Sequence, residues 1–87
     1  MKIKLFGGLR QKAGRAEIEV PGATIREALH NVCAENEILQ AAIFDGNVLH
    51  AHVRVMVNGR DSELAQGLDT TVSADDQIAI FPPIAGG

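Results

Sequence analysis

The sequence predicts an α+β domain in which a mixed, four- to five-stranded sheet packs on one main helix. Two patterns carry this prediction. Apolar residues recur at helical spacing in residues 25–35. Apolar and polar residues alternate, as in strands that bury one face, in residues 1–6, 16–20 and 77–81. Because 87 residues provide one modest core, we expect a folded domain over residues 1–81 and a flexible tail over residues 82–87.

The first two predicted strands, residues 1–6 and 16–20, are joined by a glycine-rich stretch. Gly7-Gly8 ends the first strand, and we expect a turn followed by a connection as far as Gly14. These glycines lack the glycine and lysine spacing of a phosphate-binding loop, so a turn is the preferred interpretation. Two strands with a short connection predict an antiparallel hairpin.

The main helix is predicted over residues 25–35. Thr24 and Glu27 fit a capping box, in which the Thr24 hydroxyl accepts a hydrogen bond from the Glu27 backbone N–H and the Glu27 carboxylate reaches back to the start of the helix. The apolar stripe of this helix should face the sheet. Cys33 lies on that stripe, so we expect a packed thiol rather than a nucleophile. A second, shorter helix is predicted for residues 37–44.

Residues 48–57 are the most β-rich run and are predicted as one strand, with valines on one face and Met56 on the other. His50 and His52 stand two apart, a spacing that two metal ligands can use. The sequence offers no third ligand, so we interpret them as exposed strand histidines and expect no metal site. Asn58-Gly59 then predicts a tight turn.

The next segment, residues 60–76, has no regular pattern and is predicted as a surface loop. Its apolar anchors are expected to be Leu64, Leu68 and Val72. Asp75-Asp76 is interpreted as a turn rather than a catalytic pair. In the last strand, alternation places Phe81 on the outer face of the sheet. An outward aromatic residue just before a tail is a natural anchor for a partner.

Composition narrows the classes of function. The net charge of −3 argues against nucleic-acid binding. Cys33 is the single cysteine, which excludes an internal disulfide and a thiolate cage for a metal. No apolar run approaches the length of a membrane span, and the first residues lack the pattern of a signal peptide. We therefore expect a cytoplasmic protein that does not bind membranes.

The residues that suggest a specific chemistry are the last seven, Phe81-Pro82-Pro83-Ile84-Ala85-Gly86-Gly87. Prolines prevent the strand from continuing, because they fix φ and donate no N–H. Gly86 and Gly87 lack a Cβ, so such a tail could enter a narrow enzyme channel and present a carboxylate as a reactant. The alternative is an ordinary frayed chain end.

Together with three internal motifs, this ending resembles the ubiquitin-like sulfur carriers of the MoaD and ThiS type. The group most similar to the chain is the small subunit of molybdopterin synthase, and residues 37–52 resemble its extended relatives. The resemblance spans essentially the whole chain and implies a β-grasp, ubiquitin-like fold. The three internal motifs are Leu9-Arg10 with Ala13-Gly14, Pro21-Gly22-Ala23-Thr24, and Val57-Asn58-Gly59-Arg60.

The resemblance also implies a mechanism. An E1-like adenylyltransferase would adenylate Gly87 with ATP and Mg²⁺, and a cysteine desulfurase or rhodanese would supply sulfur for a thiocarboxylate. Gly86 would give access to the channel, while Phe81, Pro82, Pro83 and Met56 would contact partners. These partners include a sulfur-accepting synthase and a metal-dependent isopeptidase. The chain would bind no cofactor and would be a carrier, or the small subunit of a synthase, rather than an enzyme.

Two other functions are compatible with the sequence. The chain could be a ubiquitin-like modifier joined to lysines through Gly87, which would use the same activation. It could also be an interaction module whose tail is inert. The acceptor of the sulfur and the pathway are not identified by these motifs.

Overall fold

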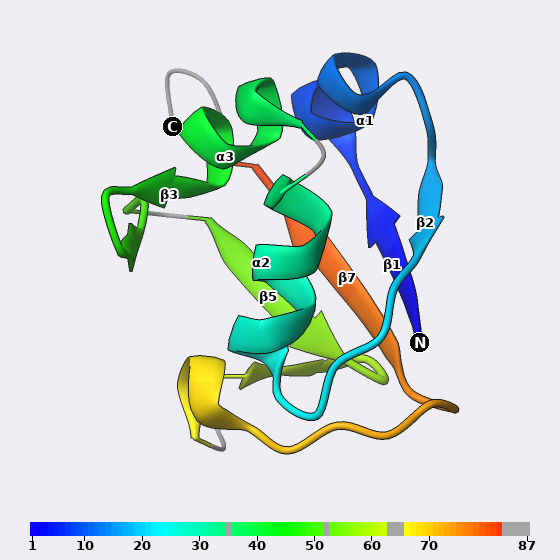
Figure 1. Ribbon diagram of the computed structural model, residues 1–87. Coiled ribbons are helices and arrows are strands. Elements are labelled where there is room, and N and C mark those ends of the chain that lie inside the picture. The colour runs from blue at the N-terminus through cyan, green and yellow to red at the C-terminus, as the bar shows by residue number, and fades with distance from the viewer. Residues whose placement is uncertain (35, 52, 63–65, 83–87) are drawn as a thin grey trace.

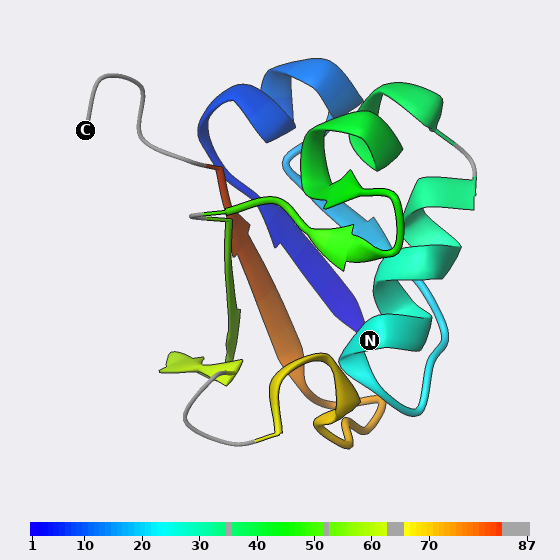
Figure 2. The same ribbon diagram turned by 90° about the vertical axis from the view of Figure 1, so that its left-hand side faces the viewer.

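The structure is a computed structural model, and it describes residues 1–34, 36–51, 53–62 and 66–82. The described residues form a sheet that is covered on one side by helices (Figures 1 and 2). The predictions for His52, Leu64, Pro83, Gly86 and Gly87 lie outside the described residues.

The sheet is mixed and five-stranded, with the order β2-β1-β7-β5-β6. The central pair, β1 (Lys2–Leu5) and β7 (Gln77–Phe81), is parallel. The other pairs are antiparallel and involve β2 (Glu17–Glu19), β5 (Arg54–Val57) and β6 (Arg60–Asp61). Asn58 and Gly59 both have positive φ, 50° and 84°, in the turn between β5 and β6, which confirms the predicted tight turn.

Three α-helices surround one side of this sheet. They are α1 (Gly7–Ala13), α2 (Ile25–Ala34) and α3 (Glu37–Ile43), and a 3₁₀ helix, η2 (Gly67–Asp69), precedes β7. Helix α2 lies across the sheet, whereas α1 lies beside the ends of β1 and β7 (Figure 2). The hydroxyl of Thr24 accepts a hydrogen bond from Glu27 N–H at 3.2 Å, as the predicted cap requires.

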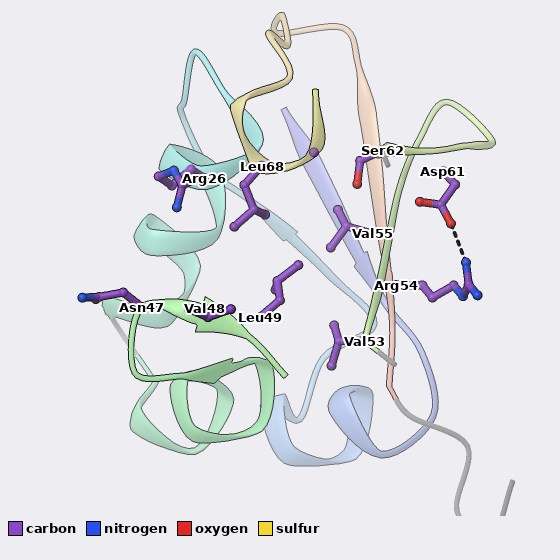
Figure 3. Close-up of a pocket in the computed structure, with 11 residues that line it drawn as sticks. Arg26, Asn47, Val48, Leu49, Val53, Arg54, Val55, Asp61, Ser62 and Leu68 are labelled. Atoms are coloured by element: carbon purple, nitrogen blue, oxygen red, sulfur yellow. Dashed lines mark hydrogen bonds and ion pairs between the residues drawn. The ribbon is translucent and has the colours of Figure 1, made fainter. Parts of the chain in front are cut away.

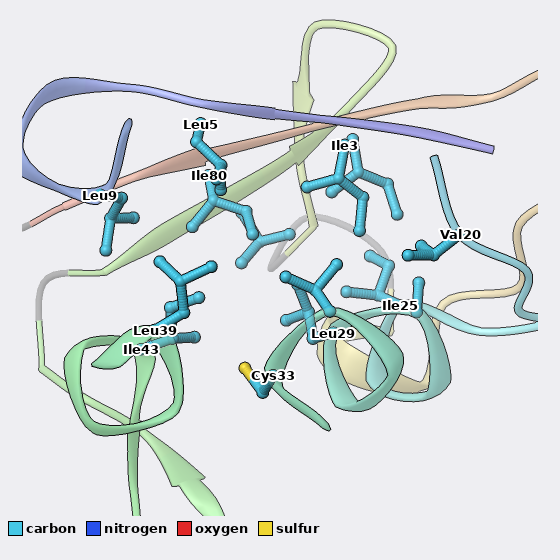
Figure 4. Packing of buried hydrophobic residues seen from close by; sticks show 14 of the residues in the cluster. Ile3, Leu5, Leu9, Val20, Ile25, Leu29, Cys33, Leu39, Ile43 and Ile80 are labelled. Atoms are coloured by element: carbon cyan, nitrogen blue, oxygen red, sulfur yellow. The ribbon is translucent and has the colours of Figure 1, made fainter. Parts of the chain in front are cut away.

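The core lies between the sheet and these helices (Figure 4). The sheet contributes the side chains that alternation placed on its inner face, and the helices contribute their apolar stripes. The largest fully buried side chains are Ile3, Leu5, Leu9, Ile25, Leu29, Leu39, Ile43, Val55, Ile78 and Ile80. The α+β class, the mixed sheet and the main helix are therefore confirmed.

The prediction of a turn and a connection for residues 7–14 is wrong, because this stretch is helix α1. Its signals are weak in the sequence. Phe6 occupies the N-cap position and makes no side-chain capping bond, and two glycines, which are poor helix formers, begin the helix. Gly14 ends it with φ of 71° and donates its N–H to Arg10 and Gln11, which is a recognisable C-cap. Strands β1 and β2 pair as expected, but a helix connects them.

The prediction of one strand for residues 48–57 is also wrong. Residues Val48–Leu49 form β4, which pairs with β3 (Phe44–Asp45) in a separate two-stranded sheet, and only Arg54–Val57 joins the main sheet. Between them the N–H of Val53 bonds to the carbonyl of His50 at 3.2 Å, which closes a turn. A β-rich composition favours extended backbone without showing which neighbour each part pairs with.

The start of β7 is tied to the β5–β6 turn by Asp76. Its carboxylate accepts hydrogen bonds from the Asn58 side chain at 2.9 Å and from the Ser73 N–H at 2.7 Å. These bonds, that of Asn58 first, hold the pKa of Asp76 below its ordinary value of 3.8. Asp75-Asp76 is therefore a structural turn, as the sequence predicts.

Because the pKa of Asp76 is lower in the folded state, its stabilising contribution is present above the ordinary pKa and is lost as the pH falls through the folded value. We expect the free energy of unfolding of Asp76→Asn to decrease less than that of the wild type as the pH falls through this acidic range. Urea unfolding midpoints measured between about pH 7 and about pH 2 test this expectation. Asp75→Asn is the matched control, and equal acid sensitivity of the two variants would contradict this assignment.

Candidate docking surface and the base of the tail

The outer face of the sheet, opposite the helices, carries a strip of apolar side chains. The register between β5 and β7 determines which side chains form this strip. Met56 on β5 lies opposite Ala79 on β7, and Phe81 lies opposite Arg54 at the end of β7. The alternate residues of β7, Ile78 and Ile80, are fully buried in the core, so alternation directs Ala79 and Phe81 outward. Two of the predicted partner residues, Phe81 and Met56, therefore share one face.

Phe6, which the sequence motifs do not single out, joins this strip. Its ring stacks on that of Phe81, with centroids 4.5 Å apart and an interplanar angle of 11°. Phe6 is 39% exposed, and Phe81 is half-buried rather than freely exposed. Alternation along β1 places Lys2, Lys4 and Phe6 on the same face. This alternation is visible in the sequence and is the pattern that predicts an outward Phe6.

Pro82, the first residue of the tail, contacts the folded domain at Gly7. The N–H of Phe6 donates to the carbonyl of Ile80 at 3.2 Å, so the ends of β1 and β7 are joined at this point. Gly7 follows with φ of 57°, and Pro82 packs beside it. We call the set formed by Phe6, Met56, Ala79, Phe81 and Pro82 the docking strip.

Charged side chains flank the docking strip and are paired with one another. Lys2 and Lys4 approach the Glu17 carboxylate at 3.6 and 4.0 Å, and Arg54 donates to Asp61 at 2.8 Å. Exposed pairs of this kind add little stability. Their effect here is to surround an apolar strip with a polar rim, an arrangement that is common at protein interfaces.

The single thiol of the chain is removed from this surface. Cys33 is 5% exposed within the core, and burial raises its pKa to about 11. The thiol is therefore protonated at neutral pH and is unsuited to act as a nucleophile or a sulfur carrier. The prediction of a packed thiol is confirmed.

No cluster of three or more potential metal-ligating side chains is found within residues 1–34, 36–51, 53–62 and 66–82. His50 lies outside a strand, and its Nε2 is 2.9 Å from the carbonyl oxygen of Ala41. It is half-buried, so the prediction of an exposed strand histidine is wrong for this residue. No helix of the described part of the chain is long and apolar enough to cross a membrane.

A cavity of about 540 Å³ lies between β5, the β3–β4 hairpin and η2 (Figure 3). Val53 and Val55 face Leu49 and Leu68 across it, whereas Arg54 and Asp61 lie on the other side of β5. The second arginine at this cavity, Arg26, is paired with Asp69 at 3.2 Å. The lining mixes apolar side chains with polar ones such as Asn47 and Ser62, and both of its arginines are paired with carboxylates, so it does not suggest a reacting group.

Comparison with known proteins identifies the family and supports the fold. The model of the ThiS family matches residues 3–87. Small archaeal modifier protein 1 of Haloferax volcanii is 34% identical over 91 residues, covering 100% of both chains. The solution structure of small archaeal modifier protein 1 from Methanosarcina acetivorans has a TM-score of 0.92 at 29% identity, covering 99% of this chain and 94% of that chain.

A chain in the crystal structure of the Amycolatopsis orientalis BexX/CysO complex has a TM-score of 0.87 at 29% identity, covering 99% of this chain and 98% of that chain. The ubiquitin-like β-grasp fold and the family match thus place the chain among small carrier proteins, which are not themselves enzymes. The chain belongs to the ThiS family.

Proposed function

We propose that this protein is a sulfur carrier. An E1-like enzyme adenylates the Gly87 carboxylate, which becomes a thiocarboxylate that donates sulfur in the biosynthesis of molybdopterin, cysteine or another thio-metabolite. The observation that carries the proposal is the docking strip at the base of a tail whose sequence ends in Gly86-Gly87. The only thiol of the chain is buried, so the terminal carboxylate is the group that can carry sulfur.

A carboxylate is a poor electrophile, so activation must come from a partner. One Gly87 oxygen attacks the α-phosphorus of Mg²⁺-bound ATP, and pyrophosphate leaves. The resulting acyl adenylate carries AMP as a good leaving group. The terminal sulfur of a persulfide, held by a cysteine desulfurase or rhodanese, displaces AMP, and a thiol then reduces the acyl disulfide to the thiocarboxylate. The carrier contributes recognition and presents its terminus.

The sequence of the tail suits this role. Gly86 and Gly87 have no Cβ, so they fit a channel in which a side chain would clash. Pro82 and Pro83 restrict the backbone where the tail leaves β7. The proposed division of roles is chemistry at Gly87, access at Gly86 and recognition by Phe81, Pro82, Pro83 and Met56. We add Phe6 to the proposed recognition residues because its ring stacks on Phe81.

The docking strip is proposed to serve the successive partners of the carrier. These are the adenylyltransferase, the sulfur donor and a sulfur-accepting synthase, of which the chain would form the small subunit. A metal-dependent isopeptidase is a further proposed partner. The similar BexX/CysO structure is described as a complex, which supports partner binding by a chain of this fold.

The proposal is tested by producing the chain together with an E1-like enzyme and a sulfur donor. We expect the intact mass to show one oxygen replaced by sulfur. The control is Gly46→Asn, at a turn residue with φ of 66° and no described atom within 4 Å of an added Cβ. The absence of any sulfur-bearing form, with both partner enzymes shown to be active, would contradict the proposal.

A relative named as a modifier raises conjugation to lysine as the second function. The same activated terminus would serve it. Tryptic digests of the host proteome decide between the two, because conjugation leaves residues 61–87, the peptide that follows Arg60, attached to target lysines, whereas sulfur transfer leaves no such remnant. We expect the thiocarboxylate, without such remnants, to be the principal product.

A further inference from the structure

The contact between Gly7 and Pro82 connects two segments that are distant in the sequence. Gly7 is the first residue of α1, and Pro82 is the first residue after β7. A Cβ placed on Gly7 would lie 3.0 Å from Pro82 Cγ and 3.5 Å from Pro82 Cδ. The shorter distance is below ordinary van der Waals contact, so the proline ring occupies space that any other residue at position 7 would fill.

The surroundings of Pro82 leave its ring little freedom to yield. The preceding residue, Phe81, is stacked on Phe6, and Phe6 N–H bonds to the carbonyl of Ile80. The following residue in the sequence is Pro83, which restricts Pro82 to an extended backbone conformation. A displacement of the Pro82 ring would therefore rotate the start of the tail rather than being absorbed locally.

We propose that Gly7 is a positioning residue that fixes the direction in which the tail leaves the sheet. It acts through Pro82: the absence of a Cβ lets the ring rest against the start of α1. The inference rests on the proposed function, in which Gly87 must reach the active site of the activating enzyme. Gly87 is five residues beyond Pro82, a reach of up to about 17 Å, so the position of Pro82 limits the region that the reacting carboxylate can reach.

Gly14 provides a matched control at the other end of the same helix. Its φ of 71° is similar to the 57° of Gly7, but no described atom lies within 4 Å of an added Cβ. Asn is the residue of choice for both positions, because it tolerates positive φ better than most residues. Gly7→Asn and Gly14→Asn then impose similar backbone demands, and only the first adds the clash with Pro82.

The experiment measures adenylation by ATP–pyrophosphate exchange with the activating enzyme, for both variants and the wild type. We expect Gly7→Asn to lower kcat/KM by roughly tenfold to a hundredfold, as misplacement of a reacting group does. Gly14→Asn should remain within about twofold of wild type, because it leaves that group in place. The thermal midpoints of the two variants should be similar. Because Pro82 belongs to the docking strip, Pro82→Ala is also measured alone, and in that background, where the clashing ring is absent, Gly7→Asn should lower kcat/KM by only about twofold.

Equal kcat/KM for Gly7→Asn and Gly14→Asn would overturn the inference, and so would an equal loss from Gly7→Asn in the presence and in the absence of the Pro82 ring. If the wild type itself gives no exchange with an active enzyme, the proposed function fails. The inference is then decided by NMR of the free carrier. Amide shifts at Gly86 and Gly87 that change in Gly7→Asn alone support it, and unchanged shifts in both variants overturn it.

Discussion

Deletion of Gly87 is expected to abolish thiocarboxylate formation while leaving the domain folded. The carboxylate would then belong to Gly86 and would lie about 3.5 Å short of the site of adenylation, the length of one extended residue. Misplacement by about 1 Å can already cost a factor of about one hundred, so the loss should be complete within the detection limit. Intact-mass analysis after co-production with the partner enzymes measures the product, and circular dichroism confirms the fold.

Two substitutions separate the length of the tail from its width. Gly87→Ala and Gly86→Val keep the length and add a side chain, so we expect both to slow activation, with the larger valine causing the larger loss. A carrier that lacks Gly87 and still acquires sulfur would place the reactive group elsewhere and would refute the assignment of the site.

Phe81→Ala is expected to weaken association with the activating enzyme by roughly ten- to one hundredfold, because truncation of an aromatic anchor at an interface often costs about 2 kcal/mol or more. It also removes the stack with Phe6, which should lower the free energy of unfolding by about 1 kcal/mol beyond the lost burial. Isothermal calorimetry measures the affinity, and urea unfolding measures the stability.

Val48→Ala is the matched control for this prediction. Val48 is 68% exposed and apolar, but it lies on β4, in the separate two-stranded sheet. We expect it to bind the enzyme as the wild type does. If Phe81→Ala and Val48→Ala bound equally well, the docking strip would not be the recognition surface.

Much of the fold follows from local patterns in the sequence. Apolar and polar residues alternate in strands β1, β2 and β7, as expected for strands that bury one face. In α2 the capping residue Thr24 and the helical spacing of the apolar residues both indicate a helix. Helix α1 was missed because its signals are brief: seven residues, with Leu9 as the one buried side chain. Residues 48–57 were misread because extended propensity does not specify a pairing partner.

In the candidate site, too, local patterns predict some features, whereas the contacts between distant segments cannot be predicted from them. Strand alternation was sufficient to place Phe81 and Met56 on the outer face, since their neighbours belong to the core. The stack of Phe6 on Phe81 and the contact of Gly7 with Pro82 join the ends of two strands that are far apart in the chain. They depend on the parallel pairing of β1 with β7, which no local pattern specifies.

The proposed site of sulfur attachment is the terminal carboxylate of Gly87. Tandem mass spectrometry of the C-terminal fragment, from protein produced with its activating enzyme and sulfur donor, locates the sulfur. We expect the added sulfur on the fragment that contains Gly87 and an unmodified Cys33. Sulfur on Cys33, or none on the C-terminal fragment, would contradict this assignment.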